Sequence, residues 1–219
     1  MDKKNSSTPN IAFIVSIYGG DRLLYVKASI ESLINQDYQN FSIYIYLDGP
    51  VHESVREYLD RLSVINNSIR IFDGIKNKGL SIGLNFLIEK ILDNDSFKYV
   101  ARMDADDIAT SDRLSVQVEY MEKNPEITVV GGYCLEFGEN FESNIRKLPL
   151  LNSELRVRSI ARSPFIHPTV MFRMDLFKMN HIRYPDVNKG EDLELFRNLI
   201  LRGFQLANIP KILLHFRID

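Results

Sequence analysis

The first half of the chain alternates between short apolar runs and longer segments in which apolar residues recur every three or four positions. Apolar runs of this length predict strands, and the longer periodic segments predict helices. Strands are expected over residues 11–17, 41–47, 69–72 and 99–103. Helices are expected over residues 22–35, 54–65, 80–92 and 111–123. This order predicts an α/β fold with a parallel sheet and right-handed crossovers.

The second half is less regular, and its pattern predicts shorter elements. Strands are expected over residues 127–131, 133–137 and 169–172, with another beginning at 205–209, and helices over 152–161 and 191–201. Prolines bracket a loop at 163–168. Residues 211–219 resemble a strand that stops in mid-course, so we expect the native protein to continue beyond Asp219. We expect a polar tail over 1–10 and one domain over 11–219.

Composition narrows the classes of protein. The chain has 219 residues, of which 45% are hydrophobic and 26% charged, as in ordinary globular proteins. A net charge of −2 does not favour a nucleic-acid partner held by bulk charge. The single cysteine, Cys134, excludes an internal disulfide framework and fits a small buried side chain. No apolar run reaches the ~18–20 residues of a membrane helix, so a soluble or peripheral protein is expected.

Polar residues follow several of the expected strands. Ser16 and Tyr18 end the first, Asp48 follows the second, Asp73 the third and Asp104 the fourth. In parallel α/β sheets, ligands bind beyond the carboxyl ends of the strands. The pattern therefore predicts a binding site along this edge.

Three carboxylates lie within four residues at the end of the fourth strand. Asp104 and Asp106 are two positions apart, which in a strand would direct both to the same side, and Asp107 follows. Clustered carboxylates repel one another unless a cation lies between them. A hard divalent cation and the phosphates of a nucleoside diphosphate are the natural ligands. The alternative is a solvated acidic turn that caps the next helix.

Seven segments together resemble glycosyltransferase family 2, particularly bacterial members that build exopolysaccharide, capsule and O-antigen, of the amylovoran-synthesis type. The resemblance covers roughly residues 11–218. Its segments are 14–18, 31–38, 47–49, 77–80 with Asn85, 101–107, 163–173 and 190–192. It implies a GT-A fold: a single domain with a mostly parallel, mixed central sheet flanked by helices. Residues 11–107 would form a Rossmann-like nucleotide-sugar half and residues 108–219 an acceptor half.

The chain departs from the family pattern in three places. Ile17-Tyr18-Gly19-Gly20 stands where many members have Pro-x-Tyr-Asn, and Leu47-Asp48-Gly49-Pro50 where many have Asp-Asp-Gly-Ser. The terminal Tyr-Arg-x-His is replaced by residues 215–219. His215 and Arg217 are either diphosphate ligands or solvated surface residues.

The resemblance implies a donor site. Asp48 would bind the uracil ring and Tyr18 would wall the base, with an Asx-turn and simple packing as the alternatives. Residues expected at the nucleotide-sugar site are Ser16, Tyr18, Asp48, Lys78, Gly79, Asn85, Arg102 and Asp104. Backbone N–H groups at Lys78 and Gly79 would suit a diphosphate, although Gly79 also suits a helix cap. For Asn85 a structural hydrogen bond, and for Arg102 a structural ion pair, are open alternatives.

The resemblance also implies a metal and an acceptor site. Asp106 would ligate Mn²⁺ or Mg²⁺, and Asp104 would contact the metal or the ribose. Asp192 would be the base of an inverting transfer, with N-terminal capping of its helix as the alternative and Glu191 as the next candidate. Glu191 and His167 are expected at the acceptor, although a lone histidine is often structural.

The sequence thus favours an inverting, metal-dependent transferase that moves a hexose from a UDP-sugar to a hydroxyl of a lipid-linked saccharide. Its expected location is the cytoplasm at the inner membrane face, with peripheral membrane association and no nucleic acid. Two alternatives stay open. Residues 19–22, Gly-Gly-Asp-Arg, resemble part of the glycine-rich loop of a sugar-1-phosphate nucleotidyltransferase. A non-catalytic nucleotide-sugar-binding subunit is the other.

Overall fold

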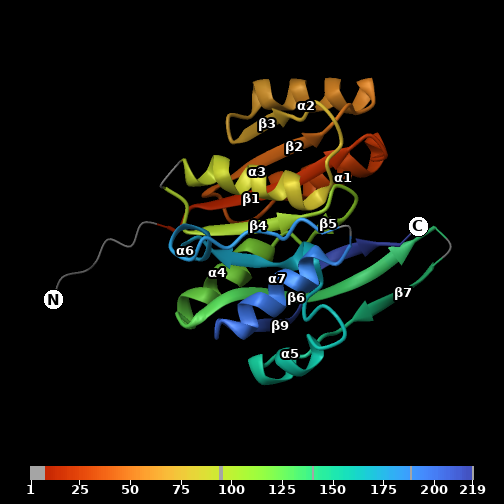
Figure 1. Ribbon diagram of the computed structural model, residues 1–219. Helices are drawn as coiled ribbons and strands as arrows, with labels where there is room; N and C mark the ends of the chain where they lie inside the picture. The colour runs from red at the N-terminus through yellow and green to blue at the C-terminus, as the bar shows by residue number, and fades with distance from the viewer. Residues whose placement is uncertain (1–7, 94–95, 140, 188, 219) are drawn as a thin grey trace.

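A computed structural model describes residues 8–93, 96–139, 141–187 and 189–218 (Figure 1). The part of the tail over residues 1–7, and Asp219, lie outside these described residues. The strands are β1 Ile11–Tyr18, β2 Phe41–Asp48, β3 Ile69–Asp73, β4 Tyr99–Met103, β5 Ile108–Ala109, β6 Ile127–Gly138, β7 Phe141–Arg146, β8 Met171–Arg173 and β9 Gln205–Arg217. The helices are α1 Leu23–Ile34, α2 Glu53–Ile65, α3 Leu80–Leu92, α4 Arg113–Lys123, α5 Asn152–Arg158, α6 Asp175–Lys178 and α7 Glu191–Leu201, with a 3₁₀ turn at His167–Thr169.

The strands form one mixed sheet in the order β3-β2-β1-β4-β8-β6-β9-β5, and β7 pairs with β6. The strands β3, β2, β1 and β4 are mutually parallel. Their carboxyl ends therefore lie along one edge, as the order of elements predicts. Beyond β4 the sheet becomes mixed, because β8 runs antiparallel to both β4 and β6, whereas β9 is parallel to β6.

Two apolar cores cover the two faces of the sheet. Alternate residues of β1 point to opposite faces, and both sets are apolar, as expected for a strand buried on both sides. Ile11, Phe13 and Val15 pack in the core that contains the buried faces of α1, α2 and α4. Ala12 and Ile14 pack in the core that contains α3, α6 and α7. The result is a three-layer domain.

Two pairs of expected strands are continuous in the structure. Residues 127–131 and 133–137 form the single strand β6, which passes through Gly131 and Gly132. A Cβ on Gly132 would collide with the Leu213 side chain, so this glycine admits β9 rather than ending a strand. Likewise, β9 continues through Pro210 to Arg217. The register between β6 and β9 shifts beside Pro210, which is where a strand tolerates a residue without an N–H group.

Other differences are smaller. The strand expected at 169–172 begins only at Met171, because His167–Thr169 forms a 3₁₀ turn with proline at its start. Helix α5 ends at Arg158, earlier than the expected residue 161. The short strands β5 and β7 and the helix α6 were not expected. Among the described residues, no helix is both long and apolar enough to cross a lipid bilayer.

Candidate active site

A cavity of about 390 Å³ opens at the carboxyl ends of the parallel strands. It is lined by residues from β1 and the turn after it, from β2, from the loop before α3 and the start of α3, and from the turn after β4: Ser16, Tyr18, Asp21, Asp48, Asn77, Gly79, Leu80, Asp104, Ala105 and Asp106. Five of the expected nucleotide-sugar residues, Ser16, Tyr18, Asp48, Gly79 and Asp104, are brought together here. Lys78, Asn85 and Arg102 do not line this cavity.

Asp48 is buried and fastens the loop that precedes α3. Its Oδ1 accepts a hydrogen bond from the Lys78 N–H and its Oδ2 one from the Gly79 N–H, both at 2.8 Å. These two N–H groups therefore have a partner other than the expected diphosphate. Gly79 adopts φ +93°, a left-handed conformation that favours glycine, and precedes α3 as its N-cap. The Lys78 side chain is exposed.

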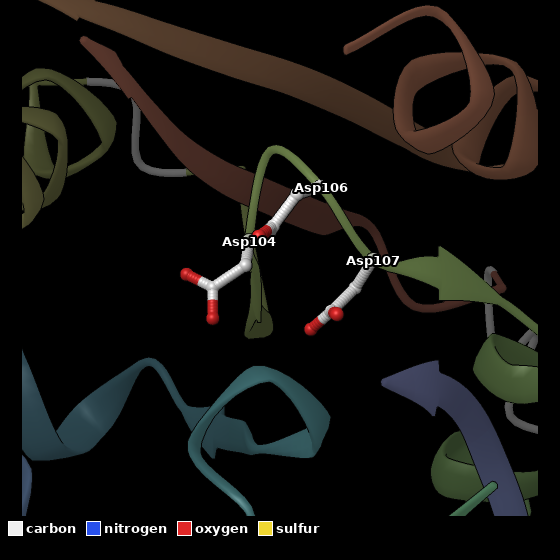
Figure 2. A group of neighbouring side chains, drawn as sticks. All are labelled: Asp104, Asp106 and Asp107. Atoms are coloured by element: carbon white, nitrogen blue, oxygen red, sulfur yellow. The ribbon is translucent and has the colours of Figure 1, made fainter. Parts of the chain in front are cut away.

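The three aspartates of the acidic segment lie on a turn between β4 and β5, after the strand has ended at Met103. Figure 2 shows the carboxylates of Asp104 and Asp107 on the same side of this turn, with that of Asp106 directed toward Asp104. One oxygen from each lies within 4.8 Å of the others. The turn brings the carboxylates together, and strand alternation, from which the clustering was expected, plays no part.

Arg102 forms an ion pair with one of these carboxylates, that of Asp104. Its side chain is 2% exposed, and its two terminal nitrogens contact both oxygens of Asp104, with Nη1 2.6 Å from Oδ2. This is the ion pair expected as an alternative role for Arg102. A second buried arginine, Arg113, donates from Nη2 to the Arg102 carbonyl at 2.7 Å and supports the end of β4. Burial lowers the pKa of Arg113 to about 9, since its guanidinium has no directly paired carboxylate among the described residues.

Asp107 is buried and joins the acidic turn to the last strand. Its Oδ1 accepts from the Arg217 N–H at 2.8 Å, and the Arg217 Nε donates to the Asp106 carbonyl at 2.9 Å. The Arg217 guanidinium lies between two rings, 3.9 Å from the centroid of Tyr25 and 4.6 Å from that of Phe137. These contacts hold Arg217 beside the acidic turn. Sequence analysis left open whether Arg217 lies at the site or on the solvated surface.

The donor set fits a hard divalent cation. Asp107 Oδ2 is buried without a hydrogen-bond partner among the described residues. Burial, followed by the charge of Asp104, raises the pKa of Asp106, and burial with the charges of Asp104 and Asp106 raises that of Asp107 to about 8. Oxygen donors that are crowded and incompletely neutralised by protein cations suit Mg²⁺ or Mn²⁺. Because Arg102 occupies both oxygens of Asp104, Asp106 is the carboxylate best placed to bind such an ion directly.

Asp21 was missed as a site residue by sequence analysis, although it follows the first strand by three positions. Its Oδ2 accepts from the Tyr18 N–H at 2.8 Å, so it shapes the turn after β1. Burial, followed by the charges of Asp106 and Asp104, raises the pKa of Asp21 to about 6. The signal was present as one more polar residue at the same sheet edge.

The raised pKa of Asp21 makes stability depend on pH. The folded protein holds this proton more tightly than the unfolded chain, in which an aspartate has a pKa of about 3.9. Its stabilising contribution is therefore present below pH ~4 and is lost as the pH rises to about 6. We expect Asp21→Asn, in buffer with EDTA, to gain stability over the wild type between these values, measured as urea midpoints. Asp60→Asn, which removes an exposed partner of Arg56, is the control. A difference that stays constant with pH would contradict the assignment.

Tyr184 contacts two of the expected site residues, Asn85 of the nucleotide-sugar set and His167 of the acceptor set. The Asn85 side chain makes two 2.8 Å bonds to the Tyr184 backbone, donating to its carbonyl and accepting from its N–H, which is the structural alternative for Asn85. The Tyr184 hydroxyl lies 3.0 Å from Nε2 of His167. Burial, followed by the charge of Arg102, lowers the pKa of His167 well below its ordinary value, so the imidazole is neutral at pH 7.

Sequence analysis did not identify Tyr184. The carboxylates of both the acidic turn and the first turn of α7 affect its hydroxyl group. Burial first, and then the charges of Asp192, Glu191 and Asp104, raise its pKa. Asp192 is in the first turn of α7, which begins after Gly190 in a left-handed conformation. Gly190 provides no side-chain cap to α7. The first turn of α7 thus carries three carboxylates, Glu191, Asp192 and Glu194, of which the first two lie close enough to Tyr184 to raise its pKa.

The fold is that of GT-A glycosyltransferases, as comparison with solved structures shows. Similar structures include S. aureus TarS 1-349 in complex with UDP-GlcNAc, with a TM-score of 0.74 and 17% identity over 96% of this chain and 59% of that chain. Another is the mannosyltransferase PcManGT from Pyrobaculum calidifontis in complex with GDP-Man and Mn²⁺, with a TM-score of 0.71 and 14% identity over 96% and 57%. The chain spans less than two thirds of each.

Sequence comparison then identifies the family. The family model described as Glycosyl transferase family 2 matches residues 13–183, and the chain belongs to that family. The amylovoran biosynthesis glycosyltransferase AmsE of Erwinia amylovora is 31% identical over 204 residues, which are 93% of this chain and 74% of AmsE. A UDP-Gal:alpha-D-GlcNAc-diphosphoundecaprenol beta-1,3-galactosyltransferase of Escherichia coli is 27% identical over 97% of this chain and 76% of that protein.

Proposed function

We propose that the protein is an inverting, metal-dependent hexosyltransferase that uses a UDP-sugar and glycosylates a lipid-linked saccharide in bacterial surface polysaccharide synthesis. The observation that carries the proposal is the cavity at the ends of β1, β2 and β4, which four carboxylates line. The names of the relatives support the substrate classes: one acts on a diphosphoundecaprenol saccharide with UDP-Gal, and another serves amylovoran synthesis. Such an acceptor would place the protein in the cytoplasm, at the inner membrane face.

The charge of the cavity supports a requirement for metal. A nucleoside diphosphate is an anion, and Asp21, Asp48, Asp104 and Asp106 would repel it. Arg102 offsets only one of these charges. Asp106, with Asp104 and Asp107 beside it, would hold Mn²⁺ or Mg²⁺. Such an ion supplies Lewis-acid stabilisation of the departing diphosphate.

The residues on the other side of the site support the transfer step. The carboxylate of Asp192 would be the base that accepts the proton of the acceptor hydroxyl, with Glu191 next to it as the alternative base. A helix N-terminus stabilises the charged form of a carboxylate, so Asp192 would be a weak base that acts mainly by its position. His167, whose Nε2 is held by the buried Tyr184 hydroxyl, would contact the acceptor. In this assignment residues 11–107 serve the donor and residues 108–219 the acceptor.

The turn after β1 does not support a nucleotidyltransferase. Asp21 N–H donates to the Tyr18 carbonyl at 3.1 Å, and a Cβ at Gly20 would collide with the Tyr18 ring. Residues 18–21 are therefore a tight turn, closed by Asp21, rather than an open loop of N–H groups.

A donor screen tests the proposal. We expect UDP to bind in calorimetry only when Mn²⁺ or Mg²⁺ is present, and GDP to bind at least about tenfold more weakly, because the proposed donor is a UDP-sugar. UDP-glucose, UDP-galactose and their N-acetyl forms, assayed with lipid-linked saccharides from bacterial membranes, would then identify the donor sugar. Metal-independent UDP binding, or release of pyrophosphate from a nucleoside triphosphate, would contradict the proposal.

A further inference from the structure

The surface where the end of α7 meets α5 is both apolar and basic. Four aliphatic side chains protrude there, and their exposed fractions are 64% for Leu151, 69% for Val157, 73% for Ile160 and 83% for Leu201. Val157, Ile160 and Leu201 line a groove of about 440 Å³ between the two helices, together with Arg156. We call the four aliphatic residues, together with Arg156 and Arg162, the α5–α7 patch. Figure 1 shows α5 at the end of the molecule opposite α2.

The positive charge around the patch is largely unpaired. Residues 146–162 include five cationic residues and one acidic residue, Glu154. Within the described parts of the chain, the exposed side chains of Arg156 and Arg162 make no ion pair. Burial, followed by the charges of Arg146 and Arg162, lowers the pKa of Arg158, which shows that these guanidinium groups lie near one another. Arg146 contacts Glu136 only at 3.5 Å.

The patch is held rigidly. Arg197 of α7 donates from Nε to the Ser159 carbonyl at 2.7 Å and from Nη2 to the Ile160 carbonyl at 2.5 Å. These bonds fasten the residues after α5 to α7 and leave Val157 and Ile160 directed outward. Arg197 is also paired with Glu194, so it contributes support rather than free charge.

We infer that the α5–α7 patch docks on the surface of a bilayer that contains anionic lipids. Exposed aliphatic side chains next to unpaired arginines match such an interface, where the aliphatics enter the acyl boundary and the guanidinium groups contact phosphates. A protein partner fits less well, because protein interfaces are enriched in aromatic residues and the patch has none.

The position of the patch agrees with a substrate that arrives from a membrane. Asp192 and Leu201 are nine residues apart on α7, so roughly 14 Å of helix separates the candidate base from the patch. A docked molecule would hold its acceptor side near the lipid surface. The relation between the patch and the acceptor rests on the proposed function, whereas the docking of the patch on a bilayer does not.

Vesicle co-sedimentation of the full chain tests the inference. We expect binding to vesicles of phosphatidylglycerol and phosphatidylethanolamine, much weaker binding to phosphatidylcholine, and a decrease with salt. Arg156→Glu should lower the partition coefficient about fivefold, and adding Arg162→Glu should lower it more than tenfold. The matched control is Arg61→Glu, an exposed arginine on α2, which should bind as the wild type does. Val157→Ser with Ile160→Ser should also weaken binding.

Three results would overturn the inference. The first is no binding of the wild type to anionic vesicles at low salt. The second is equal loss for Arg156→Glu and Arg61→Glu. The third is a dimer in light scattering that the patch variants dissociate, which would make the patch an interface between copies of this chain. UDP calorimetry on the same variants separates this inference from the proposed function. A failure of UDP binding in the wild type contradicts only the function, and intact UDP binding without vesicle binding contradicts only the docking.

Discussion

Replacing Asp106 with alanine is expected to lower kcat/KM for sugar transfer by about a thousandfold, equivalent to about 4 kcal/mol of transition-state stabilisation. The reason is that both oxygens of Asp104 are occupied by Arg102, and Asp107 is buried with one oxygen bonded to the Arg217 N–H, which leaves Asp106 as the most accessible carboxylate for the cation. Initial rates at saturating Mn²⁺ give the loss. Calorimetry of UDP should show in parallel that binding no longer responds to Mn²⁺.

The control for Asp106 is Asp112→Ala, which removes a nearby carboxylate whose partner is Lys211 on β9. This variant should keep the Mn²⁺ response of the wild type. Full metal-dependent activity in Asp106→Ala would show that the ion binds elsewhere. A loss confined to Asp104→Asn would instead identify Asp104 as the ligand and make the Arg102 pair a resting arrangement that opens with the donor.

Asp192→Asn should lower kcat by about a hundredfold to ten-thousandfold while leaving the dissociation constant for UDP unchanged. The amide is nearly isosteric with the carboxylate but cannot take up the acceptor proton. Because Asp192 lies in the first turn of α7 and Asp48, Asp104 and Asp106 line the cavity, donor binding and proton removal should separate cleanly. Steady-state rates and UDP calorimetry on the same preparation measure the two effects.

Two further variants on α7 sharpen this experiment. Glu194→Gln changes another first-turn carboxylate, which is paired with Arg197, and should keep nearly full activity. Glu191→Gln tests the alternative base. If Glu191→Gln loses activity and Asp192→Asn does not, the assignment of the base is wrong by one residue. Equal small losses in all three would indicate that these carboxylates only stabilise the helix terminus.

The parallel part of the fold was predictable because its signal is local. The strand β1 begins with a continuous apolar run, β2 and β4 are apolar along most of their length, and α3 and α7 begin after glycines with positive φ, at Gly79 and Gly190. The strands β6 and β9 were divided in the prediction because glycine and proline usually interrupt strands. Only the packing of Leu213 against Gly132, 81 positions away, shows why the strand continues.

The residues of the candidate site were predictable as chemical types, but their partners were not. Asp48, Asp104 and Asp106 line one cavity, as expected because parallel strands bring their carboxyl ends together, whereas Asp73 at the end of β3 lies outside it and pairs with Arg56. The contacts of Asp48 with Lys78 and Gly79, of Asn85 with Tyr184 and of Asp107 with Arg217 join residues 30 to 110 positions apart. No periodicity in one sequence reports such pairs. Buried Arg113 was likewise missed, because an arginine in an amphipathic helix normally suggests a solvated face.

The attachment of the acidic turn to β9 has a consequence for how the protein is made. The strand β5 pairs Ile108 with His215, and Asp107 is bonded to the Arg217 N–H, so the turn is completed by residues synthesised more than one hundred codons later. While the ribosome is still translating β9, the nascent chain already contains β1 to β4 and their helices, but it lacks the Arg217 N–H and side chain that contact Asp107 and Asp106. Formation of this long-range contact is therefore the late step that completes the acidic turn in a newly made chain.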